Sequence, residues 1–168
     1  MHGDDFTFLG FEEDLVELAG QLASWFEFLI RGIVGPEEEG LKDMVILNRT
    51  IKWEHNGNKV AADRKHVARL LEFFGMDEKT RGLTVVGKKE DKDDDDEELE
   101  DYQKTQFRGM AATANYLSAD RPDMQFGAKE LCCLMSRPTK GAMRRLKELA
   151  RYLVSFPEAD LWYEDQFW

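Results

Sequence analysis

A long acidic run divides this sequence and limits what it can fold into. Between Lys88 and Asp101 the residues KKEDKDDDDEELED contain 10 acidic and 3 basic side chains, which is a net -7 of the chain's total of -11. A block of this kind repels itself, so it is expected to be a solvated linker rather than a piece of a core, with an interaction tail or a metal sink as the less favoured alternatives. The chain is therefore expected to have four segments: a mixed α+β segment (residues 1–87), the acidic linker (88–101), a helical segment (102–158), and a tail or truncated strand (159–168).

Length and hydrophobicity indicate one modest hydrophobic core. The chain has 168 residues, of which 42% are hydrophobic, which suffices for two packed layers and not for two independent cores. We expect an α+β fold, with a small antiparallel sheet and one or two helices followed by three helices.

Apolar periodicity gives the expected elements of the mixed segment. Alternating or β-branched runs predict strands at 6–9, 28–34, 45–53 and 59–62, with Asn56-Gly57 as a hairpin turn before the last of them. Helical spacing predicts an amphipathic helix from Phe11 to Phe26 and a second helix capped by Asp63 and closed by Gly75.

The segment after the linker is expected to be entirely helical and is basic. Three helices are predicted at about 102–118, 122–136 and 139–156. From Lys104 to Arg151 ten basic side chains face four acidic ones, a net +6. Taken alone, this excess is more often a solvated helix surface than a binding site. If it is a binding site, it suits a phosphate backbone, and the candidate residues are Lys129, Arg137, Lys140, Arg144, Arg145, Lys147 and Arg151.

Two adjacent carboxylates open the chain. Gly3-Asp4-Asp5 precedes an apolar run, and paired carboxylates in a tight turn can hold divalent cations as two-metal phosphoryl-transfer sites require. On spacing alone, a solvated turn is the more frequent explanation.

A longer pattern connects these features, because the segment from Tyr102 to Leu153 resembles the region after the polymerase palm in copia-type LTR-retrotransposon reverse transcriptases. The resemblance is carried by Asn115-Tyr116-Leu117, Asp120-Arg121-Pro122-Asp123, Phe126, Met135-Ser136-x-Pro138-Thr139, Leu146-Lys147 and Arg151-Tyr152-Leu153. Further upstream, Ile46-Leu47-Asn48-Arg49-x-Ile51-x-Trp53 and His66-Val67-x-x-Leu70-Leu71-x-x-Phe74-Gly75-Met76 are similar to a strand and a helix of that family. Gly3-Asp4-Asp5 then falls where the family has its metal-binding Tyr-x-Asp-Asp turn, with His2 in place of the tyrosine.

The resemblance implies the end of a palm followed by a thumb or connection region. It implies that Asp4 and Asp5 are vestigial catalytic metal ligands, with Mg as the cofactor if the metal site is retained, and that primed template nucleic acid is the partner. The sequence shows neither the upstream catalytic carboxylate nor the fingers residues that grip a triphosphate. We therefore expect a fragment resembling an RNA-directed DNA polymerase that is inactive in isolation.

Two alternatives remain open. The chain is an accessory interaction subunit that has lost the reaction, contacting protein through Leu15 to Val34 and its Trp-rich C-terminus; or it is a nucleic-acid-binding module without chemistry. Charged residues within Leu15 to Gly35 argue against a membrane span. Cys132 and Cys133 are expected to be reduced thiols of an intracellular protein, in the cytoplasm or nucleus, with an organelle not excluded.

Overall fold

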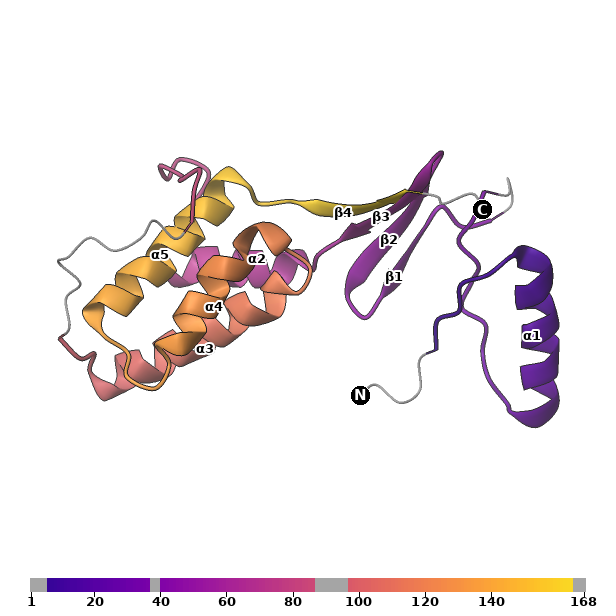
Figure 1. Ribbon diagram of the computed structural model, residues 1–168, viewed down its shortest axis with the longest axis horizontal. Coiled ribbons are helices and arrows are strands. Elements are labelled where there is room, and N and C mark those ends of the chain that lie inside the picture. The colour runs from indigo at the N-terminus through magenta and orange to yellow at the C-terminus, as the bar shows by residue number, and fades with distance from the viewer. Residues whose placement is uncertain (1–5, 37–39, 87–96, 165–168) are drawn as a thin grey trace. The chain divides into compact units, whose positions relative to one another are not determined.

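The computed structural model describes residues 6–36, 40–86 and 97–164 (Figure 1). Contacts within the chain group it into two compact units, the first ending at Ile33 and the second beginning at Val34. This boundary was not predicted from the sequence, where the division was placed at the acidic run. The predicted α+β class is confirmed by a four-stranded antiparallel sheet and five α-helices among the described residues.

The first unit contains helix α1 (Glu12–Trp25). Its first turn carries Glu12, Glu13 and Asp14, whose negative charges suit the positive end of the helix dipole. No residue of α1 is buried. The strand predicted at 6–9 is absent, because these residues pair with no other strand in the described portion of the chain.

In the second unit, the sheet consists of β1 (Asp43–Ile46), β2 (Arg49–Glu54), β3 (Gly57–Ala61) and β4 (Asp160–Glu164), in that spatial order and all antiparallel. Figure 1 shows β4, in yellow, running out from the end of the last helix to pair with β3. Within the C-terminal segment expected to be a tail or a truncated strand, Asp160–Glu164 is therefore an edge strand of this sheet.

Two turns differ from the sequence prediction. The single strand predicted at 45–53 is interrupted at Leu47 and Asn48, whose φ angles of 49° and 64° make a tight turn between β1 and β2. Leucine is unusual at a positive φ, so residue preferences did not reveal this turn. The predicted hairpin exists, but its turn lies at His55 and Asn56, with Gly57 already paired to Glu54.

The strand predicted at 28–34 is also absent. Within it, only Val34 makes a bridge, to Leu41. The apolar character of this segment suggested a strand, but most of the segment remains exposed.

The helices follow the predictions closely. They are α2 (Arg64–Phe73), α3 (Asp101–Ser118), a short 3-10 turn η1 (Pro122–Met124) with α4 (Gln125–Cys133), and α5 (Lys140–Ser155). Asp63 caps α2 as predicted, accepting a hydrogen bond from the Lys65 N–H at 2.9 Å, and Gly75 follows its end with φ 60°. The single helix predicted at 122–136 is shorter and begins as the 3-10 turn.

The hydrophobic core lies between these helices. Its fully buried side chains include Leu70, Phe107, Leu117, Met124, Leu131, Leu146, Leu149 and Leu153. The end of the acidic run belongs to this core as well: Leu99 is 5% exposed, and Asp101 already begins α3. Residues 97–101 are thus ordered structure rather than linker, because Leu99 supplies apolar surface that a solvated tether would not bury. Among the described residues, no helix combines the length and apolar character that crossing a membrane requires.

Candidate nucleic-acid interface

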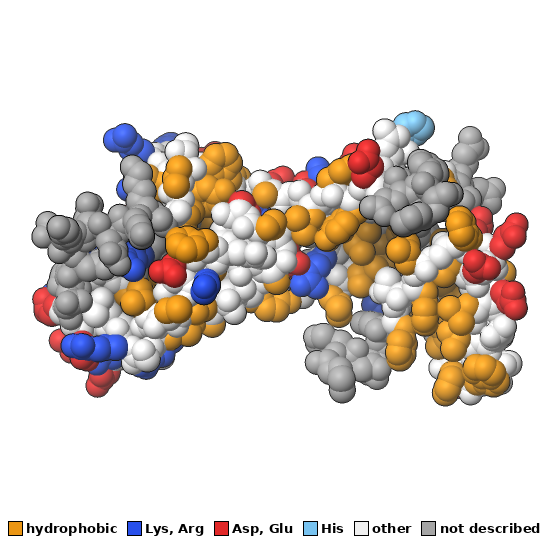
Figure 2. Space-filling model, in the orientation of Figure 1, with side chains coloured by type: hydrophobic (Ala, Val, Ile, Leu, Met, Phe, Trp, Pro, Cys, Tyr) orange, Lys and Arg blue, Asp and Glu red, His pale blue; other side chains and the backbone are white. Residues whose placement is uncertain are grey.

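Helix α5 presents a line of four basic side chains, Lys140, Arg144, Lys147 and Arg151, which we call the basic stripe. Their spacing of four, three and four residues places them on one face of the helix. From first to last they span about 17 Å at the helical rise of 1.5 Å per residue. Figure 2 shows Lys and Arg side chains, in blue, over the helical region of the molecule.

Local sequence explains why α5 presents this line. Thr139 caps the helix, its hydroxyl oxygen accepting a hydrogen bond from the Ala142 N–H at 3.2 Å. Leu146, Leu149 and Leu153 are fully buried and fix which side of the helix faces the core. The four basic side chains of the stripe lie away from these leucines.

Beside the C-terminal half of the stripe lies an open depression of about 340 Å³, the basic depression. It is lined by Phe74, Gly75, Met76, Thr80, Arg81, Lys147 and Arg151. The Arg151 Nε donates a hydrogen bond to the Arg81 backbone oxygen at 2.8 Å, which holds the loop after α2 against α5. Three of the lining side chains are cationic and none is a carboxylate, so the depression is suited to an anionic ligand.

The structure separates the seven residues predicted to bind nucleic acid. Four of them form the basic stripe, whereas Lys129 is exposed on α4 and the half-buried Arg145 is adjacent to the stripe. Arg137 precedes α5 and donates to Glu98, with 2.9 Å between Nε and Oε1.

Arg81 was missed by sequence reasoning. It lies in the loop after α2, on the far side of the acidic run from α5 in the sequence. No local pattern marks it, since only the fold brings this loop beside Lys147 and Arg151.

The predicted catalytic and metal residues Asp4 and Asp5 lie outside the described residues. Elsewhere, the described portion of the chain brings together no group of three or more His, Cys, Asp or Glu side chains able to hold a metal ion. The Mg site therefore stays a prediction.

Asp120-Arg121-Pro122-Asp123 has a structural role. Arg121 is 1% exposed and donates to the Phe156 backbone oxygen at 2.9 Å and to both carboxylate oxygens of Asp123. Asp120 accepts from Arg49 of β2, with Nε and Oδ1 2.6 Å apart. The motif thus joins the end of α3 to the end of α5 and to the sheet.

The pKa shifts of Asp123 and Tyr152 reflect the hydrogen bonds of this motif. Burial alone would raise the pKa of the Asp123 carboxyl, but hydrogen bonds from Arg121 and Tyr152 outweigh it and hold that pKa below its ordinary value. Burial, together with the hydrogen bond to Asp123, raises the pKa of the Tyr152 hydroxyl.

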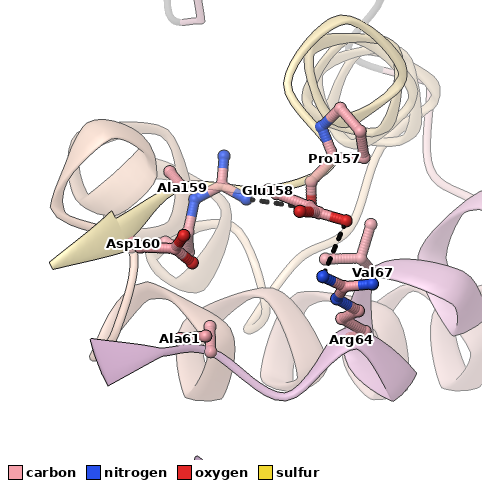
Figure 3. Close-up of a pocket in the computed structure, with 9 residues that line it drawn as sticks. Ala61, Arg64, Val67, Pro157, Glu158, Ala159 and Asp160 are labelled. Atoms are coloured by element: carbon pink, nitrogen blue, oxygen red, sulfur yellow. Dashed lines mark hydrogen bonds and ion pairs between the residues drawn. The ribbon is translucent and has the colours of Figure 1, made fainter. Parts of the chain in front are cut away.

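A small cavity adjoins Arg121, between α2 and the segment leading into β4. Its volume is about 10 Å³, room for one water molecule at most. Figure 3 shows Arg64 and Glu158 facing each other at this cavity, paired at 2.9 Å. A space of this size is too small for a ligand larger than water.

Comparison with known proteins gives one partial similarity. The chain is 34% identical over 53 residues to a protein described as "Retrovirus-related Pol polyprotein from transposon RE1" of Arabidopsis thaliana. The match covers 32% of this chain and 4% of that polyprotein. A stretch of this chain thus resembles a retroelement polyprotein. The similarity supports the view that this chain is a fragment derived from a retrotransposon, and it supports no more specific conclusion.

No protein-family profile matches the chain. No solved structure matches it either.

Proposed function

We propose that this chain is a fragment of a retrotransposon reverse transcriptase that binds primed nucleic acid without extending it. The observation that carries this proposal is the basic depression, where Arg81, Lys147 and Arg151 converge beside the basic stripe. The partial similarity to a Pol polyprotein supports nucleic acid as the anionic ligand.

The dimensions suit a phosphate backbone. The stripe spans about 17 Å, which is long enough for its cations to face successive phosphates of one strand. The cations would bind by releasing condensed counterions, which makes the contact independent of base sequence.

A binding assay with matched variants tests this proposal. A fluorescent primer–template hairpin is titrated with the chain and with Lys147→Ala and Arg81→Ala. Each variant should weaken binding and reduce the slope of log affinity against log salt by about 0.9, the value for one lost phosphate contact. Arg69→Ala is the control, because Arg69 is an exposed cation on α2 that does not line the basic depression. Equal affinity for all four proteins would overturn the proposal.

The reaction itself is expected to be absent from the isolated chain. A two-metal centre formed by Asp4 and Asp5 would need a further carboxylate and groups that hold the triphosphate, which lie in the portion of the polymerase that the resemblance does not include. Primer extension with Mg or Mn measures this. Nucleotide incorporation that disappears in Asp4→Asn or Asp5→Asn would show that activity survives.

An accessory interaction subunit is the second candidate, favoured by the exposure of apolar side chains in the first unit. Leu9 is 96% and Trp25 70% exposed, and α1 buries none of its residues. Apolar surface of this extent is typical of segments that pack against a protein partner.

Analytical ultracentrifugation with an apolar dye tests the accessory role. We expect association or dye binding, and we expect the double variant Val16→Asp with Trp25→Asp, which changes two exposed apolar side chains of α1, to abolish it. A monomer that binds no dye would exclude this candidate and leave nucleic-acid binding unaffected.

A further inference from the structure

The last residues of the acidic run are anchored beside the N-terminus of α5. The Leu99 N–H donates to the Pro138 backbone oxygen at 3.1 Å, and the Lys140 N–H donates to the Glu97 backbone oxygen at 2.9 Å. Between these bonds Glu98 forms an antiparallel bridge with Thr139. With Leu99 buried in the core, this short segment has a fixed position against the loop that precedes the basic stripe.

The carboxylates of Glu97 and Glu98 engage three cations. Glu97 Oε2 lies 2.6 Å from the Lys140 Nζ. Glu98 binds two partners, with Oε1 2.9 Å from the Arg137 Nε and Oε2 3.0 Å from the Lys104 Nζ. Lys140 begins the basic stripe, and Arg137 lies three residues before it. Both cations are therefore on the path that a phosphate backbone following the stripe would take.

Stability does not account for this arrangement. In the pairs that Glu98 and Glu97 make with Arg137 and Lys140, every side chain is between 46% and 71% exposed, and exposed ion pairs contribute about 0–1 kcal/mol each. Lys104 is more covered, at 22%. The backbone hydrogen bonds and Leu99 already hold the segment in place. What the carboxylates do change is the local potential, because they put negative charge where a phosphate would bind.

We propose that Glu97 and Glu98 compete with nucleic acid for Lys140 and Arg137, so that the chain limits its own affinity for a phosphate backbone. The inference rests on the proposed function. Nucleic acid longer than the basic depression must displace the two carboxylates before it gains contacts at the N-terminal end of α5. Hydrogen bonds from Lys104 and then Arg137 lower the pKa of Glu98, which keeps this competing charge in place at neutral pH.

A variant without the two negative charges, Glu97→Gln with Glu98→Gln, tests the competition while keeping side-chain size. It should bind the labelled hairpin on the order of tenfold more tightly at low salt, and its salt slope should steepen by about 0.9 for each cation released to a phosphate. Glu12→Gln with Glu13→Gln in α1 changes the net charge equally and should leave the slope unchanged.

A double-mutant cycle separates competition from a general charge effect. In the wild-type chain, Arg137→Gln with Lys140→Gln should lower the affinity for the hairpin only slightly, because those cations already face carboxylates. In the Glu97→Gln, Glu98→Gln background, the same two substitutions should remove the gain in affinity. Two results would overturn the competition and leave the proposed function standing. One is that the effects of the two double substitutions are additive. The other is that neutralising Glu97 and Glu98 gives no gain in affinity while Lys147→Ala still weakens binding. If none of the proteins binds at low salt, both fail.

Discussion

The buried Arg121 guanidinium makes a two-point contact with the Asp123 carboxylate. Nε lies 2.9 Å from Oδ1, and the second nitrogen pair, Nη2 and Oδ2, is 2.7 Å apart. The same guanidinium donates to the backbone oxygens of Phe156 and Pro157, at the point where α5 ends and the chain turns toward β4. One side chain therefore holds the helical core and the start of the edge strand together.

Replacing Arg121 by alanine should destabilise the fold severely. Asp123, whose side chain is 28% exposed, and the two carbonyls would lose their donor, and each buried acceptor left without its partner costs about 1–3 kcal/mol. Urea unfolding followed by circular dichroism measures the loss. Arg69→Ala, an exposed substitution on α2, should change the free energy of unfolding by less than about 0.5 kcal/mol. A similar small change for Arg121→Ala would mean that the contact contributes little.

The same pair predicts how stability depends on pH. The folded pKa of Asp123 lies below its ordinary value of 3.8. The stabilisation is therefore complete above that value and is lost as the pH falls below it toward the folded pKa. Asp123→Asn should lower stability at neutral pH and flatten the acid limb of the stability curve below the ordinary pKa of 3.8. An acid limb of unchanged slope in the variant would contradict this assignment.

Two glycines give a matched test of the helix packing. A Cβ at Gly127 of α4 would meet the Val86 side chain and lie 3.0 Å from the Leu149 Cδ1, whereas a Cβ at Gly109 of α3 meets nothing within 4 Å. Gly127→Ala should cost about 1–3 kcal/mol through overpacking, and Gly109→Ala should gain up to about 1 kcal/mol from helix propensity. Thermal unfolding of both variants checks that the two substitutions change the stability in opposite directions. Stabilisation by Gly127→Ala would show that α4 packs less closely than described.

Elements of the fold were predictable from the sequence where neighbouring residues determine them, and were missed where distant residues do. Helices with strong periodicity and recognisable caps, such as α2 behind Asp63, were predicted nearly to the residue. The turn at Leu47 and Asn48 was missed because leucine seldom adopts a positive φ. The pairing of β4 with β3 joins residues about a hundred positions apart in sequence, which no local pattern reveals.

The residues of the candidate site were only partly predictable, because some of them come together through contacts between distant parts of the sequence. The basic residues of α5 were among the candidates because the segment from Lys104 to Arg151 carries an excess of basic side chains, but that excess did not single out the four that form the stripe. Arg81 joins them only through tertiary contact, and the acidic residues Glu97 and Glu98 pair with cations about 40 positions away. The acidic run was predicted to be a linker from its charge alone, but Leu99 and the hydrogen bonds around it order its last residues.

The most direct test of the account is the salt dependence of binding between the unmodified chain and a primer–template hairpin. With the three cations of the basic depression in contact with phosphates, log affinity should fall linearly with log salt with a slope of about -3. A flat response, or no binding at low salt, would contradict the central claim that this chain holds nucleic acid through α5 and the loop after α2.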